Sequence, residues 1–257
     1  MDVNAIEDAL SEYFSEGVEA FLPHISVNCV VLVYRHPRLQ VLVHKIYGQE
    51  FRLLPGGYVK KTESIDEAAY RNLSLMGIKE VFLRQIQTFG DVKRVMDPTD
   101  LDFLELKINE DVQNWAKQRF VTVVYYGLIN LSSTHVVPGG LMSELEWLDI
   151  DDVDKLAMDH AEIVSEIRKL LATELLNHPV VANLLPETFT LKELRGLFEA
   201  ILLRPVDRGT FRRKMLKLDI IHQVDQQKDK QGRPSHIYSF NKDNYNRFLE
   251  EENKFGF

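Results

Sequence analysis

Two adjacent glycines and three of the charged residues that follow them are the part of this 257-residue chain whose residue types best suit binding chemistry. Gly56 and Gly57 allow the backbone to turn tightly and to approach another group closely. Glu63, Glu67 and Arg71 follow. A carboxylate and a guanidinium can bind a charged ligand or pair with each other. For Glu63 and Arg71 both interpretations stay open: ligand contact, or an ion pair that fixes a loop on a helix.

A helix is predicted to position these charged residues. Ser64 with Glu67 three residues later is the sequence signature of a capping box, so the helix is expected to begin there. Apolar residues then recur at helical spacing and predict one buried stripe, formed by Ile65, Ala69, Leu73 and Met76.

The segment 53–78 resembles the Nudix box, the loop–helix–loop signature of Nudix hydrolases. That signature runs glycine, five residues, glutamate, seven residues, Arg-Glu, an aliphatic residue, any residue, Glu-Glu, any residue, glycine. The chain matches it at Gly57, Glu63, Arg71 and the aliphatic Leu73. It departs where the helix glutamates belong, and residues 72–79 contain no carboxylate. The replacing residues are Asn72, Leu75 and Met76, and Gly77 comes one position early.

These departures bear directly on catalysis. The resemblance implies pyrophosphate hydrolysis on Mg²⁺, an ion that takes hard oxygen ligands in near-octahedral geometry. Asn72 offers one neutral oxygen, and Leu75 and Met76 offer none. Without anionic ligands the positioned ion and its Lewis acidity are lost. We therefore expect a Nudix-like domain without catalytic residues, bound metal or cofactor.

Composition limits the class of protein. A hydrophobic content of 45% supports a core, and a net charge of −8 confines any nucleic-acid surface to a local patch. The single cysteine, Cys29, excludes a disulfide framework and is expected to be a buried apolar residue. The sequence shows neither a signal peptide nor an apolar run of about 20 residues. A cytoplasmic protein without membrane segments is expected.

The residues before position 178 are predicted to form an effector domain, 1–177. Strands are expected at 25–34, 39–46, 80–88, 119–131 and 144–150, and helices at 2–21 and 159–176. Residues 94–117 are an insertion relative to Nudix domains, and surface elaboration and ligand binding remain alternative roles for it. The helix opening Asp159-His160-Ala161-Glu162 after a Trp-Leu strand strengthens the Nudix resemblance.

A second domain, 178–257, is predicted after a change in composition. Thr190 and Glu193 form another capping-box signature before a helix to about residue 203. A turn at 204–207, a helix at 208–218, a strand at 220–224, a polar loop at 225–235 and a strand at 236–240 follow. Helix, turn, helix and hairpin are the order of a winged helix-turn-helix. The predicted fold class is α+β: a Nudix-like α/β/α sandwich with a mixed sheet, followed by this domain.

The second domain has a basic face. Residues 204–233 contain nine basic and four acidic residues in a chain that is acidic overall. Phe211, Met215 and Leu218 mark the buried face of the second helix, which places Arg213 and Lys217 outward for the major groove. A solvated charge run is the competing interpretation. The DNA-binding candidates are Arg208, Thr210, Arg212, Arg213, Lys214, Lys217, Lys228, Lys230 and Arg233.

The two halves together resemble the Nudix-related transcriptional regulators of NAD metabolism and their arabinose-responsive relatives. The similarity lies in the segments 184–191, 199–201, 204–208, 211–214, 232–234 and 236–238. The resemblance implies a ligand-responsive regulator that binds palindromic operator DNA as a homodimer. It implies an ADP-ribose-like or a pentose effector, and the altered box favours a sugar or sugar phosphate. The effector-binding candidates are Arg52, Glu63, Glu67, Arg71 and Asp91.

Two other functions stay open at this level. The first is an active Nudix hydrolase of a nucleoside diphosphate derivative such as ADP-ribose, with Glu63, Glu67 and an insertion acid, Glu105 or Glu110, as ligands. The second is a winged helix that binds protein instead of DNA. The sequence leaves open the operator, the effector and whether the regulator is a repressor or an activator.

Overall fold

The computed structural model describes residues 21–46, 51–79, 81, 83–94, 110, 114–115, 117–130, 134–139, 142–177, 182, 184–228, 232 and 234–244. The helix predicted at 2–21 lies outside these residues except for Phe21, which begins a strand, so the predicted end of the helix is wrong. Most of the 94–117 insertion also lies outside the described residues. The chain forms two compact units. Unit 1 draws on Met1–Leu32, Val41–Gly127 and Thr134–Ser165, and unit 2 on Val33–Gln40, Leu128–Ser133 and Glu166–Phe257.

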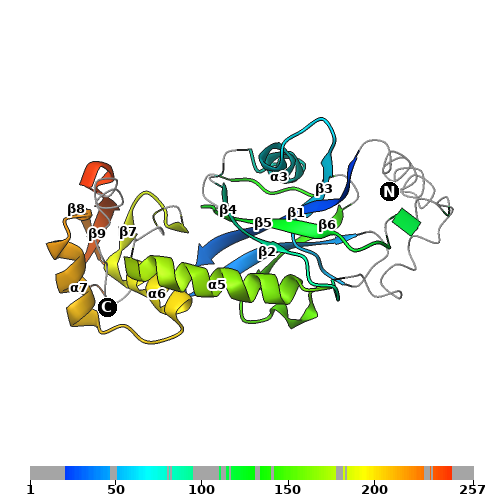
Figure 1. Ribbon diagram of the computed structural model, residues 1–257. Helices are drawn as coiled ribbons and strands as arrows, with labels where there is room; N and C mark the ends of the chain where they lie inside the picture. Colours follow the sequence, from blue (N-terminus) through cyan, green and yellow to red (C-terminus); the bar gives the residue numbers. More distant parts are fainter. Residues whose placement is uncertain are drawn as a thin grey trace. The chain divides into compact units, whose positions relative to one another are not determined.

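A six-stranded sheet forms the larger layer of the Nudix-like part (Figure 1). Its strands are β1 (Phe21–Arg35), β2 (Arg38–Ile46), β3 (Gly56–Lys60), β4 (Leu83–Phe89), β5 (Val121–Leu128) and β6 (Met142–Asp149). They are ordered β4-β5-β1-β2-β6, and β3 pairs with β1. The central β1 is fully buried from Cys29 to Leu32, as its run of apolar residues predicts.

The glycine pair opens a strand instead of forming the predicted turn. Gly56 and Gly57 pair with Asn28 and Val27 of β1 in antiparallel register. The predicted close approach is confirmed, because a Cβ on Gly56 would collide with the Val27 carbonyl and one on Gly57 would lie 2.5 Å from Asn72 Oδ1. Glycine is required here by proximity and not by a left-handed backbone.

Helices cover the sheet. The helix α3 (Ile65–Ser74) lies on one face and α5 (His160–Asn177) begins on the other, after the short helix η2 (Val153–Lys155) (Figure 1). Ser64 and Glu67 make the predicted capping box. Ala69, Leu73 and Met76 are fully buried, whereas Ile65 is only half-buried. The helix stripe predicted from sequence is therefore confirmed in three of its four members.

The winged helix lies within unit 2. It contains β7 (Phe189–Thr190), α6 (Leu191–Leu202), α7 (Arg208–Lys217), β8 (Ile221–Lys228) and β9 (Pro234–Phe240), with strand order β7-β9-β8. Phe198 and Phe211 pack edge to face at 5.1 Å and join α6 to α7. The polar loop predicted at 225–235 is wrong in extent, since β8 continues to Lys228 and β9 begins at Pro234.

No helix in the described ranges is both long enough and apolar enough to cross a membrane.

Candidate functional site

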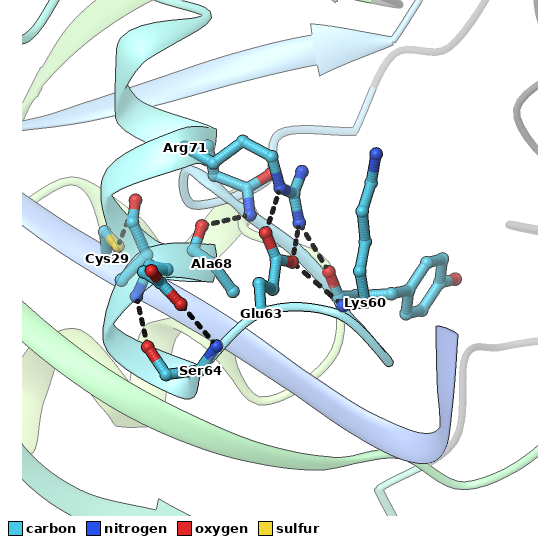
Figure 2. Close-up of polar contacts among 10 residues, drawn as sticks. Cys29, Lys60, Glu63, Ser64, Ala68 and Arg71 are labelled. Carbon is cyan, nitrogen blue, oxygen red and sulfur yellow. Dashed lines mark hydrogen bonds and ion pairs between the residues drawn. The ribbon is translucent and has the colours of Figure 1, made fainter. Parts of the chain in front are cut away.

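An ion pair closes the Nudix-like loop onto α3 (Figure 2). Arg71 donates from Nη2 and Nε to the two carboxylate oxygens of Glu63 at 2.7 and 2.8 Å, and from Nη2 to the Tyr58 carbonyl at 2.8 Å. Glu63 Oε1 also accepts the backbone N–H of Lys60 at 2.8 Å. The hydrogen bonds from Arg71 are the main reason why the pKa of Glu63 lies below its usual value. Both side chains thus hold the loop in place.

Asn72, at the position of the first helix glutamate, is part of the packing. Its side chain is buried, with 3% of the residue exposed, and its Nδ2 donates to the Ala68 carbonyl at 2.8 Å. Its amide also lies against the backbone of Gly57.

The single cysteine is buried and unreactive. Burial raises the pKa of Cys29 to about 12, so this thiol is protonated at neutral pH.

The backbone of residues 135–139 packs against the end of α3, where the Nudix signature has its pair of glutamates. Val137 N–H donates to the Met76 carbonyl at 3.1 Å. Gly77 adopts φ 79°, and a Cβ there would lie 2.9 Å from the His135 carbonyl. Gly139 lies directly against the Leu75 carbonyl, with no room for a Cβ. The segment 135–139 is therefore fitted to a helix end that carries apolar side chains.

The remaining effector candidates have partners of their own. Arg52 Nε donates to Glu146 Oε2 at 2.6 Å. Asp91 Oδ1 accepts the Lys93 N–H at 2.8 Å, and Glu67 closes the cap with Ser64. Of the five candidates, the structure joins Glu63 and Arg71 by direct contact. Within the described residues, no group of three or more His, Cys, Asp or Glu side chains is arranged to hold a metal ion.

A buried polar network in unit 1 was not predicted. Arg94 donates to Asp159 at 2.7 Å, to the Phe120 carbonyl at 2.8 Å and to Asn28 at 3.3 Å, and Thr122 donates to Asn28 at 2.9 Å. Burial is the main influence on Arg94 and lowers its pKa, and Asp159 opposes that effect. No local sequence pattern indicates this network, because its members come from four separate segments.

Two buried histidines lie beside this network. The Leu54 N–H donates to His160 Nδ1 at 3.1 Å, so this nitrogen is unprotonated. Burial lowers the pKa of His160 to about 3 and that of His44 to about 4. The prediction placed His160 only at a helix start. Its position as the first residue of α5 is confirmed, and the structure adds the contact with Leu54.

The second helix of the winged helix presents the predicted basic face. Asp207 caps α7 by accepting the Thr210 N–H at 2.8 Å, and Phe211 and Met215 are 1% exposed. Lys214 is half-buried, and burial lowers its pKa. The exposed candidates are Arg208, Thr210, Arg212, Arg213, Lys217 and Lys228, while Lys230 and Arg233 lie outside the described residues.

Known proteins share this arrangement. Residues 181–240 match the family described as the NrtR DNA-binding winged helix domain. The ADPR responsive transcriptional repressor NtrR of Acinetobacter baylyi is 26% identical over 226 residues, which cover 85% of this chain and 82% of that protein.

Two crystal structures show the same fold. Shewanella oneidensis NrtR complexed with a 27mer DNA superposes with a TM-score of 0.65 at 24% identity, covering 86% of this chain and 95% of that one. A MutT/nudix family protein from Enterococcus faecalis superposes with a TM-score of 0.58 at 22% identity, covering 85% and 88%.

A Nudix-like domain joined to a winged helix with a basic second helix defines a class, and this chain is a Nudix-related transcriptional regulator. Within that class its winged helix is of the NrtR type.

Proposed function

We propose that this regulator is an operator-binding repressor whose Nudix-like domain binds ADP-ribose or a closely related nucleotide without hydrolysing it. The observation that carries the proposal is the exposed basic face of α7 within a winged helix of the NrtR type. A recognition helix with outward basic side chains can enter the major groove, while nearby phosphates attract the remaining cations.

The similarity to an ADPR responsive repressor supports the choice of effector. It favours an ADP-ribose-like nucleotide over the sugar or sugar phosphate that the altered box suggested. A sugar or sugar phosphate remains the alternative effector, and the same binding experiment can test it. We assign effector binding to Arg52, Glu63, Glu67, Arg71 and Asp91, of which Glu63 and Arg71 act by fixing the loop.

The chemistry around α3 supports binding without hydrolysis. Asn72 is buried and hydrogen bonded, and Leu75 and Met76 supply no oxygen ligand from their side chains. A pyrophosphate would therefore be held without the metal that polarises it and activates water. The hydrolase alternative requires other acids, and Glu110, the described member of the suggested pair, is exposed.

Operator recognition by a homodimer completes the proposal. A two-fold protein matches a palindromic site, in which each winged helix reads one half. In this account residues 1–177 bind the effector and residues 178–257 bind DNA. The mass of the complex on a duplex with one site, measured by light scattering, should correspond to two chains for each duplex.

The direct experiment measures operator affinity with and without ADP-ribose. A duplex selected from a random-sequence pool with the full-length chain serves as the operator, and fluorescence anisotropy gives Kd across a series of salt concentrations. We expect tight binding that weakens steeply with salt. ADP-ribose, but not ribose or arabinose, should weaken binding, and chromatography should show the nucleotide intact after incubation with Mg²⁺.

Each result separates the alternatives. Failure to select any duplex would exclude the DNA-binding role and favour a protein partner for the winged helix. Release by arabinose alone would identify a sugar effector. Mg²⁺-dependent turnover of ADP-ribose would establish a hydrolase.

A further inference from the structure

A short hairpin of the Nudix-like sheet contacts the first helix of the winged helix within unit 2. The hairpin residues Val33–Gln40 belong to the same compact unit as α6. Tyr34 is 9% exposed, and its hydroxyl lies 2.8 Å from Nδ1 of His36, whose ring it meets edge to face at 5.9 Å. The two side chains thus form one small polar cluster at the end of β1.

This cluster lies directly against Gly196, in the middle of α6. A Cβ on Gly196 would lie 2.5 Å from Tyr34 Oη and 3.0 Å from Cε1 and Nδ1 of His36. Glycine in a helix interior lowers helix stability relative to alanine, so a helix position that tolerates glycine calls for a reason. The close approach of Tyr34 and His36 supplies that reason.

Further contacts hold the same helix to its surroundings in unit 2. Arg168 of α5 donates from Nη2 to the Ala200 carbonyl of α6 at 2.8 Å. Asn130 donates to the Leu185 carbonyl at 3.0 Å and so holds the segment that precedes α6. Burial, followed by the negative charges of Glu193 and Glu199 on α6, raises the pKa of Tyr34. The Tyr34 hydroxyl is therefore kept protonated.

The middle of β1 pairs with β3, the strand that leads into the Nudix-like loop. β1 is one strand from Phe21 to Arg35, and its residues Val27 and Asn28 pair with Gly57 and Gly56. Cys29 N–H also donates to the Pro55 carbonyl at 2.7 Å. A strand is a stiff element. At roughly 3.3 Å for each residue, Asn28 and Tyr34 lie about 20 Å apart along β1. A shift of the loop can therefore be carried along β1 to Gly196.

We propose that Tyr34 and His36 seated on Gly196 form the mechanical link through which effector occupancy changes operator affinity. The inference rests on the proposed function, because it requires that one ligand affects binding of the other. Coupling of this kind needs an element with two arrangements that both ligands influence. The contact on Gly196 is so tight that α6 must move when the hairpin moves.

Gly196→Ala tests the link. Three quantities are measured on the full chain: Kd for ADP-ribose alone, Kd for the selected duplex alone, and Kd for the duplex at saturating ADP-ribose. The ratio of the two duplex constants is the coupling factor, roughly 5- to 150-fold for typical coupled sites. We expect the variant to keep both separate affinities and its coupling factor to fall to about one.

Two further variants keep the test decisive. Tyr34→Phe removes the hydroxyl nearest to the added Cβ, so Tyr34→Phe with Gly196→Ala should regain part of the coupling that Gly196→Ala loses. Gly209→Ala makes the same helix-favouring change in α7, where the new Cβ meets nothing closer than Asp207 at 3.6 Å, and its coupling factor should match wild type. If Gly196→Ala does not fold, Tyr34→Phe alone should lower the factor.

The outcomes distinguish the two proposals. A wild-type chain whose duplex affinity ignores ADP-ribose contradicts the proposed function. If ADP-ribose weakens duplex binding by the wild type and by Gly196→Ala to the same degree, the mechanical link is overturned and the proposed function stands. Where Gly196→Ala does not fold, an equal response of Tyr34→Phe has the same meaning. Equal loss in Gly196→Ala and Gly209→Ala also overturns it, since helix propensity would then explain both.

Discussion

Two buried histidines contribute to the way the protein responds to acid. His44 and His160 have folded-state pKa values of about 4 and 3, below the ordinary value of 6.5, because burial disfavours their charged forms. The unfolded chain therefore binds more protons as the pH falls below 6.5. Their stabilising contribution is complete above that pH and is lost as the pH falls to about 4 for His44 and to about 3 for His160.

This linkage predicts a steep pH dependence of the unfolding free energy. Each histidine contributes a slope of up to about 1.4 kcal/mol for each pH unit between pH 6 and 4. His44→Gln removes one of the two titrations and should make the slope correspondingly shallower. Urea unfolding at pH 7, 6 and 5 measures the slope, and an unchanged slope in the variant would contradict the assignment.

The ion pair of Glu63 and Arg71 fixes the loop by charge-assisted hydrogen bonds. Glu63→Gln should destabilise the fold by about 2 kcal/mol, since hydrogen bonds to charged groups contribute about 1.5–3 kcal/mol. Glu166→Gln is the matched control. Its exposed pair with Lys169 is 2.7 Å long, and exposed pairs contribute about 0.2–1 kcal/mol. Chemical unfolding should give a clearly larger loss for Glu63→Gln.

At the scale of elements, α6 ends in an unfavourable conformation. Leu203 caps the helix with φ 56°, a left-handed conformation that glycine adopts most easily, and the residue is 67% exposed. Leu203→Gly should therefore raise the unfolding free energy by about 0.5–1 kcal/mol. Leu216→Gly, an exposed site within α7, should lower it by about 1 kcal/mol. Thermal unfolding of both variants checks the opposite signs.

The basic face of α7 should decide operator affinity. Arg213→Ala and Lys217→Ala should each weaken binding, and each lost phosphate contact should reduce the slope of log Kd against log salt by about 0.9. A contact with a base edge would instead relax sequence preference. Lys169→Ala, an exposed lysine on α5, is the control and should bind as wild type. Wild-type affinity in both α7 variants would refute the assignment.

The elements also show what sequence patterns can and cannot predict. Both capping boxes, the buried β1 and the two helices of the winged helix were predicted because their signals are local. The partners of Gly56 and Gly196, and the Arg94 network, were not, because contacts between distant segments leave no local pattern. β7 was missed because two residues are too few for a strand signal.

For the whole molecule, the absence of a metal requirement can be tested through stability. A ligand that binds only the folded chain stabilises it by about 2.7 kcal/mol at a hundred times its Kd. ADP-ribose should raise the Tm of the full chain, and EDTA should leave that increase unchanged. A rise that disappears in EDTA and returns with Mg²⁺ would show that a metal holds the nucleotide, contrary to the proposal.

The fit between the end of α3 and the segment 135–139 bears on how this domain could have evolved. Gly77 and Gly139 leave no room for side chains, and Asn72 is built into the packing against Gly57. Placing a single glutamate here would supply one acid without its companions and would disturb the backbone and side chains packed against that position. A metal site on this helix would therefore need several substitutions together, so single mutations offer no stepwise route to one.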